Sequence, residues 1–200
     1  FFRPIFNSST QLSIFGCPFQ ATSFREILSP VIQTPYFPVN FETLKARIDF
    51  TDFCHGSLKI DDLTITSIPL SHPNRGLGYR FEENGKSFVF LTDNELGYQH
   101  PGGLKYNDYR DFAKGADLLV HDTEYLPEEY SNDSKKWGHS SYTDALRLAM
   151  DAGVVRFGLY HHNQDRKDVD IDVMVEDCQK KADGSNLECF AMGQDMETFL

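Results

Sequence analysis

Apolar and polar residues alternate along the first half of the chain with the two-residue period of half-buried β-strands. Strands are predicted over Leu12–Phe15, Leu44–Phe50, Ser57–Ile60 and Leu63–Leu70. Between the first two strands, Thr22–Ser29 has the pattern of a short helix. The two prolines of Pro35-Tyr36-Phe37-Pro38 exclude a regular element there.

A β-hairpin gives the clearest local signal in the chain. Its two expected strands are Gly78–Glu82 and Ser87–Leu91, with the turn Glu83-Asn84-Gly85-Lys86 between them. An Asn-Gly pair supplies the positive φ angles that tight hairpin turns need. The second strand leads directly into Thr92-Asp93-Asn94-Glu95, so that polar residues follow an apolar strand.

Helix and strand patterns alternate in the second half of the chain. Helices are predicted over Tyr106–Lys114, Tyr142–Ala152 and Val169–Ala182, and strands over Asp117–His121, Val154–Tyr160, Glu188–Ala191 and Glu197–Leu200. Ser141 can cap the second helix and Gly153 can end it. Strands followed by β-α-β-α predict an α/β fold with a sheet layer packed against helices. No internal repeat or low-complexity linker stands out, so we expect one domain over residues 1–200.

The composition, with 40% hydrophobic and 14% aromatic residues, is that of a folded globular protein. The formal net charge of −11 argues against an extended nucleic-acid surface, because phosphate contacts depend on clustered Lys and Arg. No apolar run reaches membrane-spanning length and no signal peptide is visible, so we expect a cytoplasmic protein without a membrane partner. The widely spaced Cys17, Cys54, Cys178 and Cys189 contain no C-x-x-C pair, and we interpret them as buried free thiols.

Residues that can bind metal ions follow several of the apolar strands. His72, Asp93, His121 and His161 all stand at or near a predicted strand end. Strand ends on one edge of a sheet converge on a common cleft, so these side chains are expected to share a site. Histidine and carboxylate together suit zinc or another divalent first-row metal, and Asp93 could bridge two ions. The alternative is that Asp93 only caps a turn.

Six short strings, taken in order, resemble motifs of the metallo-β-lactamase superfamily. They are Ser71-His72-Pro73, Leu77-Gly78-Tyr79-Arg80, Leu91-Thr92-Asp93, Val120-His121-Asp122-Thr123-Glu124, Gly138-His139-Ser140-Ser141 and Leu159-Tyr160-His161-His162. The branch that they resemble most is the one of ribonuclease Z and phosphodiesterases. The resemblance covers most of the chain and implies the αββα sandwich of that superfamily, with residues 1–200 forming its C-terminal two-thirds.

The resemblance also implies roles for particular residues. His72 matches a ligand of the first metal, Asp93 the bridging carboxylate, and His161 the last ligand of the second metal. His162 is the alternative to His161. Strand alternation would send the two rings in opposite directions, so only one should bind, and His161 stands directly at the strand end.

His139 resembles a histidine that lies beside the metals and protonates a leaving oxygen, and Asp122 matches its acidic partner. A carboxylate can hold the imidazole in the right tautomer for general acid work. The alternative is that Asp122 and His139 only tether a loop. Glu124 and His121 are expected to support the site without binding metal.

The H-x-H-x-D-H motif of the family does not occur in the sequence. Family members place it shortly before a segment like Phe1-Phe2-Arg3-Pro4-Ile5-Phe6, so we expect it to precede this chain. It could instead reside on another polypeptide, or the chain could be a degenerate copy. His55 and His100, in a polar turn and a Gly/Pro-rich loop, are expected to be solvated and not to replace it.

The resemblance implies a metal-dependent hydrolase, first of all a phosphodiesterase that uses a metal-bound hydroxide at a dinuclear site. Two divalent ions are expected, with zinc ahead of manganese and iron. The expected substrate is a small-molecule or nucleotide phosphodiester, and a homodimer would be ordinary for relatives. One alternative is hydrolysis of a lactone, thioester or other carboxylic ester, and another is a non-enzymatic binding protein on a degenerate fold.

Overall fold

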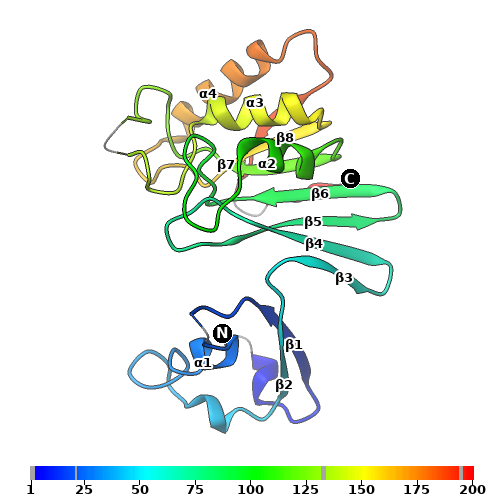
Figure 1. Ribbon diagram of the computed structural model, residues 1–200, viewed down its shortest axis with the longest axis vertical. Coiled ribbons are helices and arrows are strands. Elements are labelled where there is room, and N and C mark those ends of the chain that lie inside the picture. Colours follow the sequence, from blue (N-terminus) through cyan, green and yellow to red (C-terminus); the bar gives the residue numbers. More distant parts are fainter. Residues whose placement is uncertain (1–2, 21, 132–133, 194–195) are drawn as a thin grey trace. The chain divides into compact units, whose positions relative to one another are not determined.

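The computed structural model describes residues 3–20, 22–131, 134–193 and 196–200, so Phe1 and Phe2 lie outside the described residues. The chain divides into two compact units, Phe1–Cys54 and His55–Leu200. Each unit has its own β-sheet (Figure 1). The expectation of a single domain over residues 1–200 stays a prediction.

The first unit is built on a pair of parallel strands, β1 (Gln11–Gly16) and β2 (Arg47–Asp52). Between them lie helix α1 (Phe24–Leu28) and the 3-10 turn Phe41–Thr43, and a further 3-10 turn, Arg3–Phe6, precedes β1. Ser23 caps α1: its hydroxyl accepts from the Glu26 backbone N–H, and the Glu26 carboxylate accepts from the Ser23 N–H.

Cys17 and Cys54 form a disulfide bond, with their Cα atoms 4.5 Å apart. The prediction of four free thiols is therefore wrong for this pair. The two cysteines follow β1 and β2, whose parallel pairing brings Gly16 beside Asp52, and their separation of 37 residues in the sequence does not reveal this proximity. Cys178 and Cys189 are free and buried, as predicted.

The second unit contains a seven-stranded sheet with the order β3-β4-β5-β6-β7-β8-β9. Its strands are β3 (Gly56–Ile60), β4 (Leu63–Pro69), β5 (Leu77–Glu83), β6 (Lys86–Leu91), β7 (Leu118–Asp122), β8 (Arg156–Tyr160) and β9 (Glu188–Ala191). Strands β3 to β6 pair antiparallel, and β6 to β9 pair parallel. The predicted hairpin is confirmed, with φ angles of 51° at Asn84 and 75° at Gly85.

Helices α2 (Tyr106–Ala113), α3 (Tyr142–Ala152) and α4 (Asp168–Lys181) connect the parallel strands, as crossovers between parallel strands require. The predicted bounds of α3 are confirmed. The Ser141 hydroxyl accepts from the Asp144 N–H, and Gly153 ends the helix with a φ of 63°. The mixed α/β architecture is thus as predicted (Figure 1).

The strand expected over Glu197–Leu200 does not form. Instead, the Arg156 guanidinium donates to the Thr198 hydroxyl and to the Phe199 carbonyl, while the Phe199 side chain stays 82% exposed. The end of the chain is thus held to β8 through the Arg156 side chain.

One face of the seven-stranded sheet forms the core of the second unit with the helices. Val89, Leu119 and Phe157 are fully buried on this face, and they belong to one cluster with Leu148 of α3 and Met174 of α4. Buried and half-buried residues alternate along β6, whereas β7, in the middle of the sheet, is buried along its whole length.

The opposite face of the sheet carries a row of aromatic side chains. Tyr79, Phe81, Phe88, Phe90 and Tyr160 follow one another with ring centroids 5.7 to 6.0 Å apart. The first four are half-buried and Tyr160 is 40% exposed. These aromatic side chains thus stabilise this face through tilted and stacked contacts.

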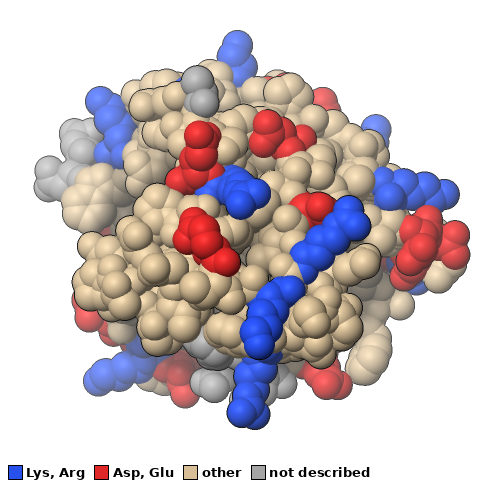
Figure 2. All heavy atoms as spheres, turned by 90° about the horizontal axis from the view of Figure 1, so that it is seen from below, with Lys and Arg blue, Asp and Glu red and all other residues tan. Residues whose placement is uncertain are grey.

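Figure 2 shows one face of the molecule, on which basic and acidic side chains both appear among a larger area of uncharged residues. Among the residues that the structure describes, no helix has the length and apolar character needed to cross a bilayer.

Gly78 on β5 provides a test of the core packing. A Cβ at this position would lie 2.4 Å from Leu91 Cδ2 and 3.0 Å from Leu70 Cδ2. Gly78→Ala should therefore lower the free energy of unfolding by about 1–3 kcal/mol through overpacking, measured by urea denaturation. Gly193→Ala is the matched control, because none of the residues that the structure describes lies within 4 Å of its added Cβ. Equal stability of the two variants would contradict the packing.

Candidate metal centre

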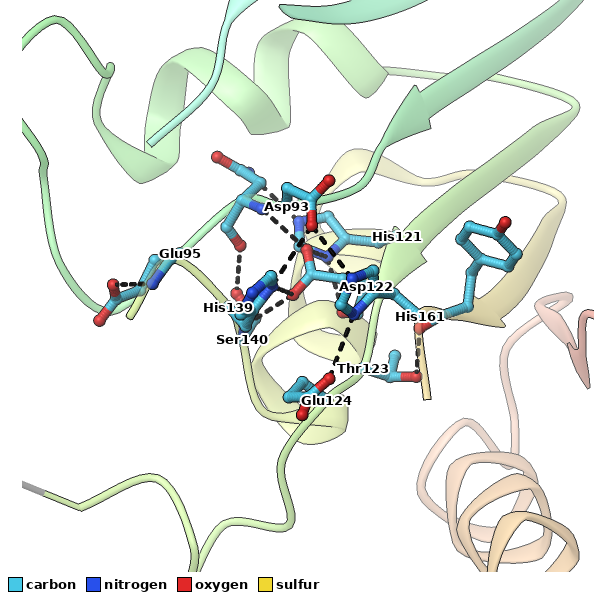
Figure 3. Close-up of polar contacts among 12 residues, drawn as sticks. Asp93, Glu95, His121, Asp122, Thr123, Glu124, His139, Ser140 and His161 are labelled. Atoms are coloured by element: carbon cyan, nitrogen blue, oxygen red, sulfur yellow. Dashed lines mark hydrogen bonds and ion pairs between the residues drawn. The ribbon is translucent and has the colours of Figure 1, made fainter. Parts of the chain in front are cut away.

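The carboxyl ends of β4, β6, β7 and β8 meet at one edge of the sheet, because these four strands run in the same direction. His72 follows β4, Asp93 follows β6, Asp122 ends β7 and His161 follows β8. His139 comes from the loop that precedes α3. The predicted convergence of strand-end residues is visible in the close-up of Figure 3.

Three of these residues form a cluster with the geometry of a cation site. One ligand atom each from His72, Asp93 and His139 lie within 4.8 Å of one another. The His72 and His139 rings meet edge to face with centroids 5.5 Å apart. The cluster includes His139, for which the sequence predicted a role in proton transfer.

His161 lies against the same carboxylate. Its Nε2 is 3.2 Å from Asp93 Oδ1, and its ring stacks on that of His139 with centroids 4.6 Å apart. Two ligand atoms that bind one tetrahedral zinc at 2.0–2.1 Å lie about 3.3 Å apart. Asp93 and His161 both have positive φ angles, 59° and 50°. Such backbone strain gathers at functional sites.

The other ring nitrogen of His161 is held by Glu124. Nδ1 lies 3.1 Å from Glu124 Oε2, and the second Glu124 oxygen accepts from Asn163 Nδ2 at 2.8 Å. The hydrogen bond with Glu124 and the nearby Asp93 raise the pKa of His161 to about 9. Histidines that bind metals usually donate their second N–H to a carboxylate in this way.

His162, the alternative ligand, has a different environment. Neither of its ring nitrogens makes a hydrogen bond to the residues that the structure describes, and burial lowers its pKa. The geometry at this strand end therefore favours His161 over His162.

The Asp122 carboxylate is fully buried beneath the cluster. One oxygen accepts from the Asn94 backbone N–H at 2.9 Å, and the other accepts from the Ser140 N–H at 2.7 Å. His139 Nδ1 lies 3.7 Å from Asp122, within the range of an ion pair but beyond hydrogen-bond length. Asp122 thus tethers two loops and also faces His139, so that both interpretations of this pair retain support.

Two opposing influences act on the pKa of His139. Burial, the larger single influence, lowers it, but the contacts with Asp122 and the charge of Asp93 together outweigh burial and raise the pKa. His139 Nδ1 is buried and has no hydrogen-bond partner among the described residues.

His121 lies outside the cluster, as predicted. It is fully buried, with Nε2 3.2 Å from Asn94 Nδ2 and Nδ1 2.9 Å from the Asp122 carbonyl. The Asn94 amide oxygen accepts from the Ser71 N–H, so the amide nitrogen must face His121. Asn94 therefore connects the loop after β4 with β7. Sequence reasoning missed this role, although Asn94 directly follows Asp93.

The prediction that His100 is solvated is wrong. It is only 5% exposed, and its Nε2 lies 2.7 Å from the buried carboxylate of Glu95. The Gly/Pro-rich sequence around His100 indicated an exposed loop, but Glu95 provides a buried partner for the ring. His55 is exposed, as predicted.

The donor set fits a divalent metal ion. Two or three imidazole nitrogens and a carboxylate are the ligands of zinc and related ions, and Glu124 orients His161 in the manner common around such ions.

Gly138 allows the close approach between the His139 loop and His72. Its φ is 102°, and a Cβ there would lie 2.2 Å from His72 Cδ2. Gly138→Ala should displace His72 and weaken zinc affinity about tenfold or more, measured by calorimetry. Gly102→Ala is the control, because it has a similar φ of 88° but an ordinary 3.6 Å contact with Arg75. Unchanged affinity in Gly138→Ala would argue against His72 as a ligand.

Comparisons with known proteins identify the family of the chain. A family model described as "Beta-lactamase superfamily domain" matches residues 30–162. Ribonuclease Z of Thermoplasma volcanium is 41% identical over 69 residues, which are 34% of this chain and 22% of that enzyme. The aligned segment is thus about a fifth of the curated relative's length.

Two solved structures have a similar fold. The metallo-β-lactamase fold protein YhfI from Bacillus subtilis superposes with a TM-score of 0.63 at 16% identity, over 90% of this chain and 60% of that one. Human tRNase Z, short form, superposes with a TM-score of 0.57 at 15% identity, over 92% of this chain and 66% of that one. The chain spans less than two thirds of either structure. The predicted resemblance is confirmed, and the chain belongs to the β-lactamase superfamily.

Proposed function

We propose that this chain contributes to a metal-dependent hydrolase that acts on a phosphodiester. The observation that carries the proposal is the placement of Asp93, whose Oδ1 lies 3.2 Å from His161 Nε2 and 3.6 Å from His139 Nδ1, in one cluster with His72. A carboxylate surrounded by three imidazoles at a strained strand end is expected for metal binding. A carboxylate that only caps a turn would not require three imidazoles around it.

His72, Asp93 and His161 are the proposed ligands of a dinuclear centre. A divalent ion bound there would polarise a phosphoryl oxygen and acidify a water molecule to a nucleophilic hydroxide. The side chain of Asp93 is 46% exposed and has two oxygens, which suits a bridging position. Zinc is the first candidate for mixed histidine and carboxylate ligands, with manganese and iron sharing these preferences.

His139 is the proposed donor of a proton to the leaving oxygen. Its raised pKa favours the charged imidazolium form that a general acid needs. Asp122 would support that charge from 3.7 Å and position His139 through its bond to the neighbouring Ser140 N–H. His139 is thus the proposed catalytic residue, and Asp122 the residue that positions it.

A small-molecule or nucleotide phosphodiester is the proposed substrate. Similar proteins named ribonuclease Z and tRNase Z support phosphodiester chemistry. The net charge of −11 supports a small substrate over a long nucleic acid.

Homodimer formation and a cytoplasmic location stay predictions. Disulfide bonds persist mainly in oxidising compartments, so the Cys17–Cys54 bond weighs against the cytoplasm.

Metal analysis of the purified full-length protein tests the proposed centre. About two equivalents of metal per chain are expected, as a two-metal site requires, and Asp93→Ala should lose most of them. His161→Ala should also lose metal, whereas His162→Ala should retain it, because His161 and not its neighbour His162 lies against Asp93. A correctly folded wild-type protein without metal would favour the binding-protein alternative. Metal loss in His162→Ala alone would reverse the assignment of the ligand.

His139→Ala separates proton transfer from metal binding. With a phosphodiester that has an alkoxide leaving group, kcat should fall about 10²–10⁴-fold, because this oxygen needs a proton. With a p-nitrophenyl phosphodiester, whose leaving group departs as an anion without a proton, the loss in kcat should be much smaller. Metal content should stay unchanged. Metal loss together with equal losses on both substrates would instead identify His139 as a ligand.

A further inference from the structure

The carboxylate of Glu95 is fully buried and accepts four hydrogen bonds. Oε1 accepts from the Tyr130 hydroxyl at 2.6 Å and from the Lys136 backbone N–H at 2.8 Å. Oε2 accepts from His100 Nε2 at 2.7 Å and from the Gly138 backbone N–H at 3.0 Å. Each oxygen therefore binds one side-chain donor and one backbone donor. A buried carboxylate is stable only with such compensation.

The two backbone donors belong to one short, strained loop segment. Lys136 has a φ of 78° and Gly138 a φ of 102°, and both N–H groups meet the same carboxylate. Left-handed backbone at a lysine persists only where the surroundings hold it. Trp137 stands between these residues, and its side chain is 65% exposed. The Trp137 N–H also donates to the Ser134 carbonyl at 3.2 Å, and the Lys136 ammonium lies 5.4 Å from the centroid of the Tyr98 ring. Glu95 adds two backbone hydrogen bonds to these contacts.

This segment leads directly into the metal centre. Gly138 lies against the His72 ring, and His139 follows it in the chain. The Glu95 backbone N–H also donates to the Ser71 carbonyl at 2.8 Å, next to His72. Through its side chain and backbone, Glu95 therefore connects the two loops that carry His72 and His139. Figure 3 draws Glu95 to the left of the cluster, with its carboxylate pointing away from Asp93.

We propose that Glu95 is a positioning residue that holds residues 136–139 against His72, and so sets the geometry of the metal centre. Only the part of this inference that concerns catalysis rests on the proposed function. Glu95 itself contacts neither substrate nor metal. It acts through the backbone of Lys136 and Gly138.

A glutamine cannot take over this role, although it has nearly the same shape. Its amide has one carbonyl oxygen, and its NH₂ group must replace one of the two carboxylate oxygens. Whichever way the amide is turned, the NH₂ faces either the Lys136 or the Gly138 N–H, and two donors then meet. One backbone N–H is left without an acceptor, so the loop should loosen.

The test compares Glu95→Gln with Tyr130→Phe in the zinc-loaded full-length protein. Tyr130→Phe is the matched control, because it removes one side-chain donor and leaves both backbone bonds intact. Trp137 is the only tryptophan of this chain and reports on the segment through its fluorescence anisotropy. In the full-length protein, any further tryptophan is replaced by phenylalanine beforehand.

In Glu95→Gln, the anisotropy of Trp137 should decay faster, zinc affinity should weaken about 10–100-fold, and kcat should fall similarly with a smaller change in KM. In Tyr130→Phe, all three should stay within about threefold of the wild type. Wild-type anisotropy and zinc affinity in a folded Glu95→Gln protein would overturn the proposal. A general loss of stability would lower the melting temperature but would not single out Trp137 and the metal.

Hydrogen exchange of the wild-type protein provides a test that does not depend on folding of a variant. The Lys136 and Gly138 amides should exchange as slowly as amides of the central strands, although the Lys136 side chain is exposed. Fast exchange at both amides would overturn the proposal. A wild-type protein without zinc binding or activity would refute the proposed function instead, while exchange and anisotropy would still decide the role of Glu95.

Discussion

The site depends on two carboxylates, Asp122 and Glu95, that are buried beneath the strand ends and accept hydrogen bonds from loop backbone. Asp122, at the end of β7, joins the segment after β6 through the Asn94 N–H and the segment before α3 through the Ser140 N–H. A buried carboxylate without such donors would be strongly destabilising. The hydrogen bonds to Asp122 therefore stabilise the fold only when both loops lie against it. Asp122 therefore links two of the loops that carry residues of the candidate site.

Glu95 and Asp122 both bind the backbone of one segment, residues 136–140. Asp122 binds the N–H of Ser140, and Glu95 binds the N–H groups of Lys136 and Gly138, so that His139 is held on both sides along the chain. The Ser140 hydroxyl adds a bond to the Asn94 carbonyl at 2.6 Å. Nδ1 of His139 has no hydrogen-bond partner among the described residues and lies 3.6 Å from Asp93 and 3.7 Å from Asp122.

The opposite side of the centre has a different support. His161 is held by Glu124, which Asn163 binds in turn, and this carboxylate is half-buried at the rim. The two histidines that stack on each other thus have separate supports, Glu124 for His161 and the loop carboxylates for His139. Separate supports allow one histidine to bind metal while the other transfers a proton, as the proposed function requires.

Local patterns determined much of this protein from the sequence by itself. Alternation, the Asn84-Gly85 turn and the Ser141 and Gly153 caps predicted the hairpin, α3 and most strands, because each depends on neighbours within a few residues. The polar residues that follow the strands indicated the edge of the sheet at which the candidate site lies. These signals are local, and a sheet with parallel strands brings such ends together.

Only the tertiary structure decided which distant residues meet. The Cys17–Cys54 bond, the burial of His100 and the bond from Gly138 to Glu95 join residues that lie outside each other's local sequence pattern. The choice between His161 and His162 likewise depends on Glu124, 37 residues away in the chain. No periodicity encodes such pairs, because they follow from how whole elements pack, and a buried polar group then binds whichever donor the packing presents.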